Sequence, residues 1–187
     1  MTVHVLGRWQ DTNGLPTYDV TSRRPFAPTT RPVPELSPFT LGPVQLWGGH
    51  WAANVENAWQ YSRRYHEHYP DWLWWVKQGW AKERADRYPL GKGAKPYCSM
   101  WGLEELDYIQ ARKRIYIPLY AQAVRFYKWD VYEQLRRQHE SSGVIAILDF
   151  DAYDRFKLGY SWDDVVNDPD RKMGHAFVLG MMIEGVL

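Results

Sequence analysis

The run Gly-Val-Ile-Ala-Ile-Leu-Asp-Phe at residues 143–150 constrains the fold of this chain more than any other segment. Five consecutive apolar residues follow the glycine, and Asp149 comes directly after them. A strand with one face in water alternates apolar and polar residues, whereas an uninterrupted apolar run is typical of a strand buried on both faces. We therefore predict a central strand here, with other elements packed against both faces.

Segments with helical spacing make up much of the remaining chain. Asn54 is the expected N-cap of a helix that runs to about residue 68, because Val55, Ala58 and Trp59 begin an apolar face. Short strands are expected over 42–49 and within 1–20. Together these patterns predict an α+β fold, a helix-rich single domain around a small mixed sheet. Further helices are expected over 71–86, 103–116, 118–139, 162–167 and 173–186, and Ser161 with Asp164 forms a capping-box-like pair at the start of the helix over 162–167.

The N-terminal region differs in composition from the rest. Residues 21–34 contain four prolines and little that could pack in a core. We therefore expect residues 1–35 to form an extended N-terminal arm and residues 36–187 to form the folded domain. A chain of 187 residues suits one domain with a real core.

Charge and cysteine content exclude several classes of protein. The formal net charge is +1, so no global field steers the chain toward nucleic acid or membrane. Cys98 is the single cysteine, which leaves no intrachain disulfide and no thiol cluster for zinc. No apolar run of membrane-spanning length is present. We expect a soluble cytoplasmic protein.

Aromatic residues are unusually frequent, with 11 Trp and 13 Tyr. Most of these rings should lie in the core, since each buries a large apolar area. A surplus of this size also suits a pocket that stacks a planar base or a sugar. Trp59, Trp101 and Tyr97 are candidates for that role.

Glu56 stands in the first turn of the predicted helix, among tryptophans and tyrosines. A carboxylate at this position is favoured by the helix dipole by roughly 0.3–1 kcal/mol, which is a purely structural interpretation. The functional interpretation is an acid or base that faces a cleft, where neighbouring rings would raise its pKa toward the working pH. Both interpretations stay open at the level of sequence.

Three acids follow the predicted central strand: Asp149, Asp151 and Asp154. They could simply solvate a turn. Alternatively, the Asp-x-Asp pair could hold a divalent cation and a nucleotide sugar, as in some glycosyltransferases.

Cationic groups offer candidate phosphate ligands. In Gly-Lys-Gly-Ala-Lys at 91–95, two glycines allow backbone N–H groups to converge, and Lys92 adds charge. Residues 112–114 carry three cations that most often belong to a solvated helix face, although some could reach phosphates. His175 is expected to cap or pack the last helix. With no Ser-His-Asp or Cys-His pattern and no metal-ligand spacing, metal-independent chemistry without a cofactor is favoured.

The order of these parts resembles NADAR-type (YbiA-like) domains. Residues 36–39, Leu-Ser-Pro-Phe, resemble the family's opening Leu-Ser-Asn-Phe, and Glu56, Gln60 and Arg63 fall on its helix glutamate, glutamine and lysine. Asp149 and Asp154 keep the spacing of a later acidic pair. The family's Trp-Gly-x-Gly is replaced by residues 155–159, and the last helix, over 174–180, lacks the family's Asn. The similarity spans about 36–187. It suggests that the chain is a divergent relative of this family, and a phage origin is one hypothesis.

The resemblance implies N-glycosidic chemistry on an ADP-ribosyl or ribosyl-phosphate bond, with a small molecule or a modified nucleic acid as substrate. It implies Glu56 as catalyst, with Asp149 or Asp154 sharing acid–base work or binding ribose. Three alternatives stay open: a non-catalytic ADP-ribose or nucleotide-binding module, a metal-dependent base-modifying glycosyltransferase, and an interaction protein that uses the proline-rich arm. The other expected substrate-binding residues are Trp59, Gln60, Arg63, Lys92, Trp101, Asp151 and His175.

Overall fold

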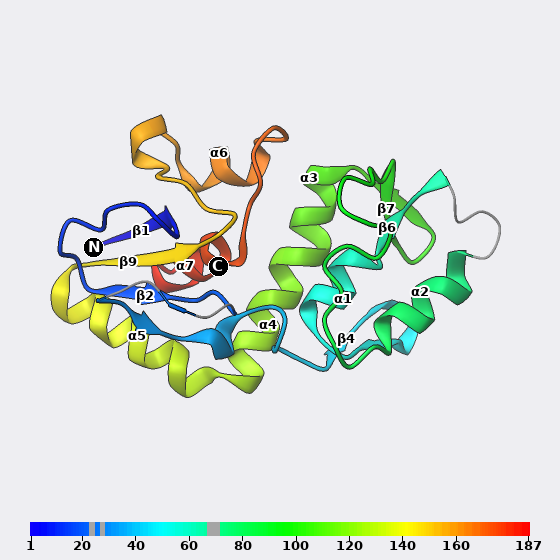
Figure 1. The fold of residues 1–187 in the computed structure, drawn as a ribbon, viewed down its shortest axis with the longest axis horizontal. Coiled ribbons are helices and arrows are strands. Elements are labelled where there is room, and N and C mark those ends of the chain that lie inside the picture. Colours follow the sequence, from blue (N-terminus) through cyan, green and yellow to red (C-terminus); the bar gives the residue numbers. More distant parts are fainter. Residues whose placement is uncertain (23–24, 27–28, 67–71) are drawn as a thin grey trace. The chain divides into compact units, whose positions relative to one another are not determined.

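The computed structural model describes residues 1–22, 25–26, 29–66 and 72–187 of the chain (Figure 1). The structure is of mixed α/β type, with 42% helix and 17% strand. Two compact units are present: unit 1 comprises Met1–Ser37 and Val124–Leu187, and unit 2 comprises Pro38–Ala123. No helix in the described part of the chain has both the length and the apolar character needed to cross a membrane.

Unit 1 is built on a four-stranded parallel sheet with the order β1-β9-β2-β3. The predicted central strand is confirmed: β9 (Val144–Asp149) lies between β1 (Thr2–Gly7) and β2 (Thr17–Asp19), and its last five residues are buried. Because the three strands are parallel, Gly7, Asp19 and Asp149 end at one edge of the sheet.

Residues 1–35 contribute three strands to this sheet, where one short strand and an extended arm were expected. β1 buries Val3 and Val5 against β9, and the short strand β2 is buried throughout. The third strand, β3 (Arg31–Pro32), forms the edge of the sheet, which is where a proline is tolerated because it donates no ladder hydrogen bond. Residues 23–24 and 27–28 of the expected arm lie outside the described residues.

Two helices pack on β9. The first is α5 (Trp129–Ser142), which ends at Gly143 in the left-handed conformation. The second is α7 (His175–Ile183), whose nine residues are all buried and which also contacts β1. The short helix α6 (Trp162–Asn167) begins with the capping box that the sequence predicts between Ser161 and Asp164. A single 3₁₀ turn, η5 (Phe156–Leu158), precedes it.

Unit 2 combines short helices with two small antiparallel sheets. β4 (Val44–Gln45) pairs with β5 (Trp51–Ala52) across the 3₁₀ turn η2 (Trp47–Gly49), and β6 (Arg63–Arg64), β7 (Cys98–Trp101) and β8 (Glu104–Leu106) form the other sheet. The described residues therefore form three small sheets, one of them parallel, where the sequence predicted one mixed sheet. The helices are α1 (Val55–Gln60), α2 (Trp72–Trp80), α3 (Tyr108–Ala111) and the first part of α4 (Ile117–Tyr127), which continues into unit 1 from Val124. A π-helical turn, η4 (Arg112–Tyr116), joins α3 to α4.

Several helix boundaries differ from the prediction. α1 stops at Gln60 and the chain turns into β6, so the helix is much shorter than expected; residues 67–68 lie outside the described part. The helix expected from 103 begins at Tyr108, because the preceding residues pair in β8. It then runs on through Pro118 with the π-helical turn placed just before the proline, which has no N–H to donate. Lys128 leaves helical geometry and separates α4 from α5.

Candidate active site in unit 2

Helix α1 is anchored at its first turn by the chain that precedes it. The Asn54 side chain accepts a hydrogen bond from Asn57 N over 2.8 Å and forms the predicted N-cap. Two further N–H groups of the first turn donate to backbone carbonyls, Val55 to Leu41 and Glu56 to Pro38. These bonds satisfy donors that a helix start otherwise leaves open. All six residues of α1 are buried, so Glu56 belongs to the interior of unit 2 and not to a solvated face.

A hydrogen-bonded row of three side chains runs from Glu56 to Arg63. Gln60 Nε2 donates to Glu56 Oε1 over 2.8 Å, and Arg63 Nη1 donates to Gln60 Oε1 over 2.9 Å. Glu56 and Gln60 are each 5% exposed. An ionised carboxylate only accepts and a guanidinium only donates, so the two neighbours together fix the orientation of the Gln60 amide. We call this set the Glu56 row.

Aromatic rings and a second guanidinium lie next to the Glu56 row. The Arg63 guanidinium sits 4.9 Å above the Trp59 ring, and Trp59 in turn packs on Tyr116 at 5.1 Å between centroids. The Arg112 guanidinium lies 4.2 Å from the Tyr108 ring, which is 6.4 Å from Trp59. Such contacts stabilise a guanidinium that has lost part of its water.

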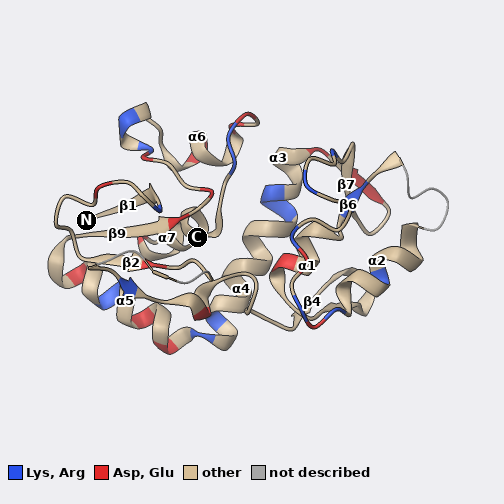
Figure 2. Ribbon diagram, viewed as in Figure 1, with Lys and Arg blue, Asp and Glu red and all other residues tan. Residues whose placement is uncertain are grey.

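Arg112 is the functional candidate that the sequence pattern conceals. For residues 112–114 a solvated helix face was the commoner expectation, with contact to phosphates as the alternative. Arg112 is only 1% exposed, and its two neighbours face solvent. Figure 2 shows the three cations as one basic turn between α3 and α4. In the π-helical turn each residue advances by a different angle than in an α-helix, so the regular spacing assumed for the sequence does not predict which cation faces inward.

A second polar network, which does not include the Glu56 row, holds α1 through Asn57 and Tyr61. Asn57 Nδ2 donates to the Lys82 carbonyl over 2.7 Å, and Asn57 Oδ1 accepts from Asp86 N over 2.8 Å. Tyr61 OH donates to Asp86 Oδ2 over 2.7 Å, and Lys82 Nζ lies 2.8 Å from the same carboxylate. Burial raises the pKa of Tyr61, against the opposing effect of Lys82. The network attaches the helix that carries Glu56 to the segment after α2.

Two other predicted substrate-binding residues of unit 2 lie outside this row. Lys92 is exposed on the turn around Gly91 and Gly93, and Trp101 is half-buried at the end of β7. Neither side chain makes a hydrogen bond, ion pair or ring contact with the Glu56 row in the described part of the chain.

The remaining predicted site residues belong to unit 1. Asp149 and His175 form a buried pair: His175 Nδ1 lies 3.0 Å from Asp149 Oδ2, and Nε2 lies 3.0 Å from the Val20 carbonyl. Both ring nitrogens thus face acceptors, a geometry that favours an imidazolium. Burial alone would raise the pKa of Asp149, but His175 and the backbone N–H groups of Phe150 and Ala176 hold it below its ordinary value.

Asp151 and Asp154 also have partners within unit 1. Asp151 lies 3.5 Å from Lys172 Nζ, and Asp154 Oδ1 accepts from the backbone N–H of Phe156, the first residue of η5, over 3.0 Å. Asp149 of the Asp-x-Asp pair therefore faces the His175 imidazole, and Asp151 faces the Lys172 ammonium. Among the residues that the structure describes, no three His, Cys, Asp or Glu side chains are grouped so that they could hold a metal ion.

The sequence-predicted residues therefore fall into two sets. Unit 2 brings together Glu56, Trp59, Gln60 and Arg63, and unit 1 brings together Asp149 and His175. No known protein family, curated protein or solved structure matches the chain. The chemistry of the chain's own residues must therefore carry the functional interpretation.

Proposed function

We propose that the chain is an N-glycosidase-type hydrolase and that Glu56 is its catalytic carboxylate. The observation that carries the proposal is the Glu56 row, in which a buried acid is held by an amide whose orientation is itself fixed by Arg63. A preorganised carboxylate of this kind suits a reaction in which positive charge develops on a sugar. The resemblance to NADAR-type domains supports the same chemistry.

In the proposed reaction, water adds to the anomeric carbon as the bond from that carbon to the base nitrogen breaks. Glu56 takes the proton from the water and stabilises the oxocarbenium-like transition state, and the departing nitrogen is protonated in turn. The products are the free base and a ribose hydroxylated at the anomeric position. No metal or cofactor takes part in this sequence.

The substrate proposed for this site carries phosphate and ribose, as an ADP-ribosyl or ribosyl-phosphate compound does. Arg63 is half-buried beside Glu56 and offers a guanidinium fork that suits phosphate oxygens. Trp59 is only 8% exposed and lies beneath Arg63, so its role is to support that guanidinium. Trp101 is half-buried at the end of β7 and is the ring proposed to stack on the base.

Glu56→Gln tests the proposal directly. The full chain is incubated with NAD⁺, with an N-ribosylamine 5′-phosphate and with an oligonucleotide that carries ADP-ribosylated guanine, and the released sugar is identified by mass spectrometry. Release by the wild type from at least one substrate, and its loss in Glu56→Gln at nearly unchanged thermal stability, is the expected result. Glu83→Gln removes an exposed carboxylate from unit 2 and serves as the matched control. Undiminished turnover in Glu56→Gln would exclude Glu56 as the catalyst.

A non-catalytic nucleotide-binding module is the second candidate function. It is favoured by the low exposure of Glu56 and by the bond that already engages its Oε1 atom. Saturable binding of ADP-ribose, without sugar release from any of the three substrates, would establish this alternative.

A further inference from the structure

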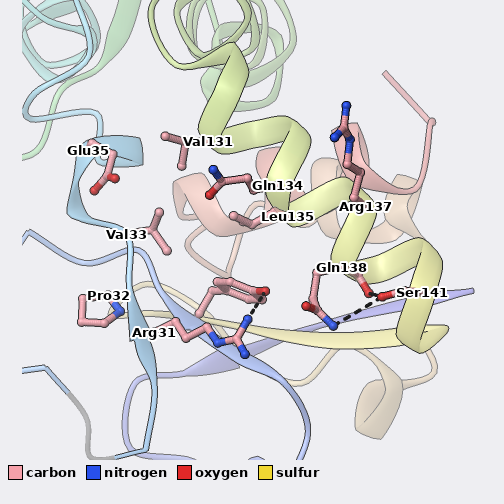
Figure 3. A pocket seen from close by; sticks show the side chains of 11 residues that line it. Arg31, Pro32, Val33, Glu35, Val131, Gln134, Leu135, Arg137, Gln138 and Ser141 are labelled. Atoms are coloured by element: carbon pink, nitrogen blue, oxygen red, sulfur yellow. Dashed lines mark hydrogen bonds between the residues drawn. The ribbon is translucent and has the colours of Figure 1, made fainter.

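Unit 1 contains a groove of about 630 Å³ between the edge of the parallel sheet and helix α5 (Figure 3). Its strand side is formed by Tyr18 of β2 and by residues 31–33 and 35, and its helix side by residues of α5 between Val131 and Ser141. Volumes of about 300–1,000 Å³ are usual for sites that bind small ligands. No sequence motif pointed to this groove, because its walls come from segments about a hundred residues apart.

Arg31, on the exposed edge strand β3, is the charged group at the polar end of this groove. Its Nη1 donates to Tyr18 OH over 3.3 Å, and its guanidinium lies 5.9 Å from the Tyr18 ring. Among the described residues, no carboxylate lies within ion-pair distance of Arg31. A single long hydrogen bond to a neutral hydroxyl leaves most of the five guanidinium donors to solvent or to a ligand.

Neutral polar side chains face Arg31 from α5. Figure 3 shows Gln138 bonded to Ser141 on this wall, with Gln134 one turn away along the helix. Arg137 points away from the other lining side chains, and it lies 3.8 Å from Glu133, a carboxylate that Arg136 already binds at 2.8 Å. The groove therefore contains amide and hydroxyl groups around one guanidinium, with a second guanidinium on the rim.

The groove has an apolar end next to this polar end. Val33 and Leu135 are buried and Val131 is half-buried, and the three side chains line the same part of the groove (Figure 3). Glu35 is the single carboxylate among the lining residues, and Figure 3 places it at the far side of the apolar end from Arg31. An anionic group is thus attracted to one end only, while the surface beside it favours an apolar body.

We propose that this groove binds a small organic oxyanion, in which a phosphate or carboxylate pairs with Arg31 and an apolar body lies on Val33 and Leu135. The planar guanidinium fork matches the two oxygens of either group in a bidentate arrangement. The ligand is thus defined by charge and shape: one oxyanion, attached to a body about the size of an aromatic ring.

A peptide strand added to the sheet edge is a poorer occupant. β3 is only two residues long, and Val33 N already donates inward to the Asp19 carbonyl. Pro32 has no N–H, so the outer edge of β3 lacks the donor that strand addition requires.

The test is a titration of the full chain with four probes, in which binding is measured by calorimetry and by changes in amide chemical shifts. The probes are phenyl phosphate, phenylacetate, inorganic phosphate and benzyl alcohol. At least one of the two aromatic anions should saturate a single site, shift the amides of Arg31, Gln134 and Gln138, and bind more tightly than inorganic phosphate or benzyl alcohol. The tighter of the two anions identifies the oxyanion as phosphate or carboxylate.

Variants distinguish binding in this groove from a general attraction of anions to the protein surface. Arg31→Gln and Gln134→Glu should each lower the affinity for the tighter anion by about tenfold or more. Arg31→Gln removes the cation, and Gln134→Glu adds a repelling charge. Lys157→Gln and Gln122→Glu make the same charge changes at exposed positions that do not line the groove, and they should bind like the wild type. Glu56→Gln should also bind like the wild type, which separates this site from the proposed active site.

The proposal is overturned by any of three results. The first is that neither aromatic anion saturates the protein. The second is that Arg31→Gln binds the tighter anion as well as the wild type does. The third is that inorganic phosphate or benzyl alcohol binds as tightly as both aromatic anions.

Discussion

Gln60 holds Glu56 across one turn of α1, with Nε2 and Oε1 2.8 Å apart, while its own carbonyl oxygen accepts from Arg63 over 2.9 Å. The amide thus joins the Glu56 carboxylate to the Arg63 guanidinium through one hydrogen bond to each. Because both bonds to the amide are charge-assisted, the orientation of the acid depends on a residue that carries no charge itself.

Gln60→Leu is expected to remove the hydrogen bonds that orient the Glu56 carboxylate, while Glu56 and Arg63 both remain in the chain. If Glu56 is the catalyst, kcat should fall by about tenfold or more, with a smaller change in KM, because the loss concerns orientation in the transition state. The measurement is steady-state kinetics on the substrate that the wild type cleaves. Gln78→Leu, on the exposed face of α2, is the matched control, and an equal loss in both variants would contradict the positioning role.

Gly79→Ala tests the packing behind α1. Gly79 lies in α2 directly against the Tyr61 ring, and a Cβ added there would overlap the ring atoms. Alanine favours a helix over glycine by about 0.8–1 kcal/mol, but overpacking costs about 1–3 kcal/mol, so we expect a net loss of roughly 1 kcal/mol. Thermal or urea unfolding measures it. Gln78→Ala, at the preceding exposed position, should be neutral or slightly stabilising; stabilisation by Gly79→Ala would contradict the close contact.

The features that could be predicted from sequence are the ones with strong local causes. The apolar run at 144–148 has no polar residue to place in water, and it forms the buried strand β9 as predicted. Asn54 and Ser161 form the expected caps, because a side-chain oxygen two or three residues before free N–H groups is sufficient for that role.

The features that sequence did not predict depend on distant contacts. β2 and β3 are too short to give a pattern. β2 forms a strand because β9 offers a pairing edge, and β3 in turn pairs with β2. α1 was expected to be longer because helical spacing continues to Tyr65, but pairing of Arg63 and Arg64 with β7 takes over. Burial of Arg112 follows from the π-helical turn, which no spacing rule anticipates.

The buried pair of Asp149 and His175 predicts an acid-sensitive contribution to stability. Since the folded-state pKa of Asp149 lies below its ordinary value of about 3.8, the pair stabilises the fold fully above that pH, and the stabilisation is lost as the pH falls through the lower folded-state pKa. Asp149→Asn should cost about 3 kcal/mol at neutral pH, because it leaves His175 buried without its anion.

Urea unfolding between neutral and strongly acidic pH measures this effect. The difference between wild type and Asp149→Asn should shrink below about pH 4. Asp154→Asn, which alters only an exposed hydrogen bond to Phe156 N, should cost about 1 kcal/mol or less. A constant difference at all pH values would show that Asp149 acts through shape and not through charge.

His139 predicts a second pH dependence, in a different range. Its side chain is buried on α5, and Nε2 has no hydrogen-bond partner among the described residues. Burial lowers the pKa of His139 below its ordinary value of about 6.5, and the Glu184 carboxylate only partly opposes this. The unfolded chain therefore binds this proton more readily, so the stabilisation is present above pH 6.5 and is lost as the pH falls through the folded-state value.

The free energy of unfolding is expected to change with pH, and His139→Phe should remove the part of that slope that is due to His139. This expectation does not depend on the absolute stability of the variant. Phenylalanine keeps a ring in the space but binds no proton, so the free energy of unfolding should change less between about pH 7 and pH 5 than in the wild type. Urea unfolding at several pH values in this range provides the measurement. His66→Phe, which replaces a histidine at an exposed position of unit 2, serves as the matched control. An unaltered slope in His139→Phe would mean that another group titrates in this range and that burial of His139 contributes no pH dependence.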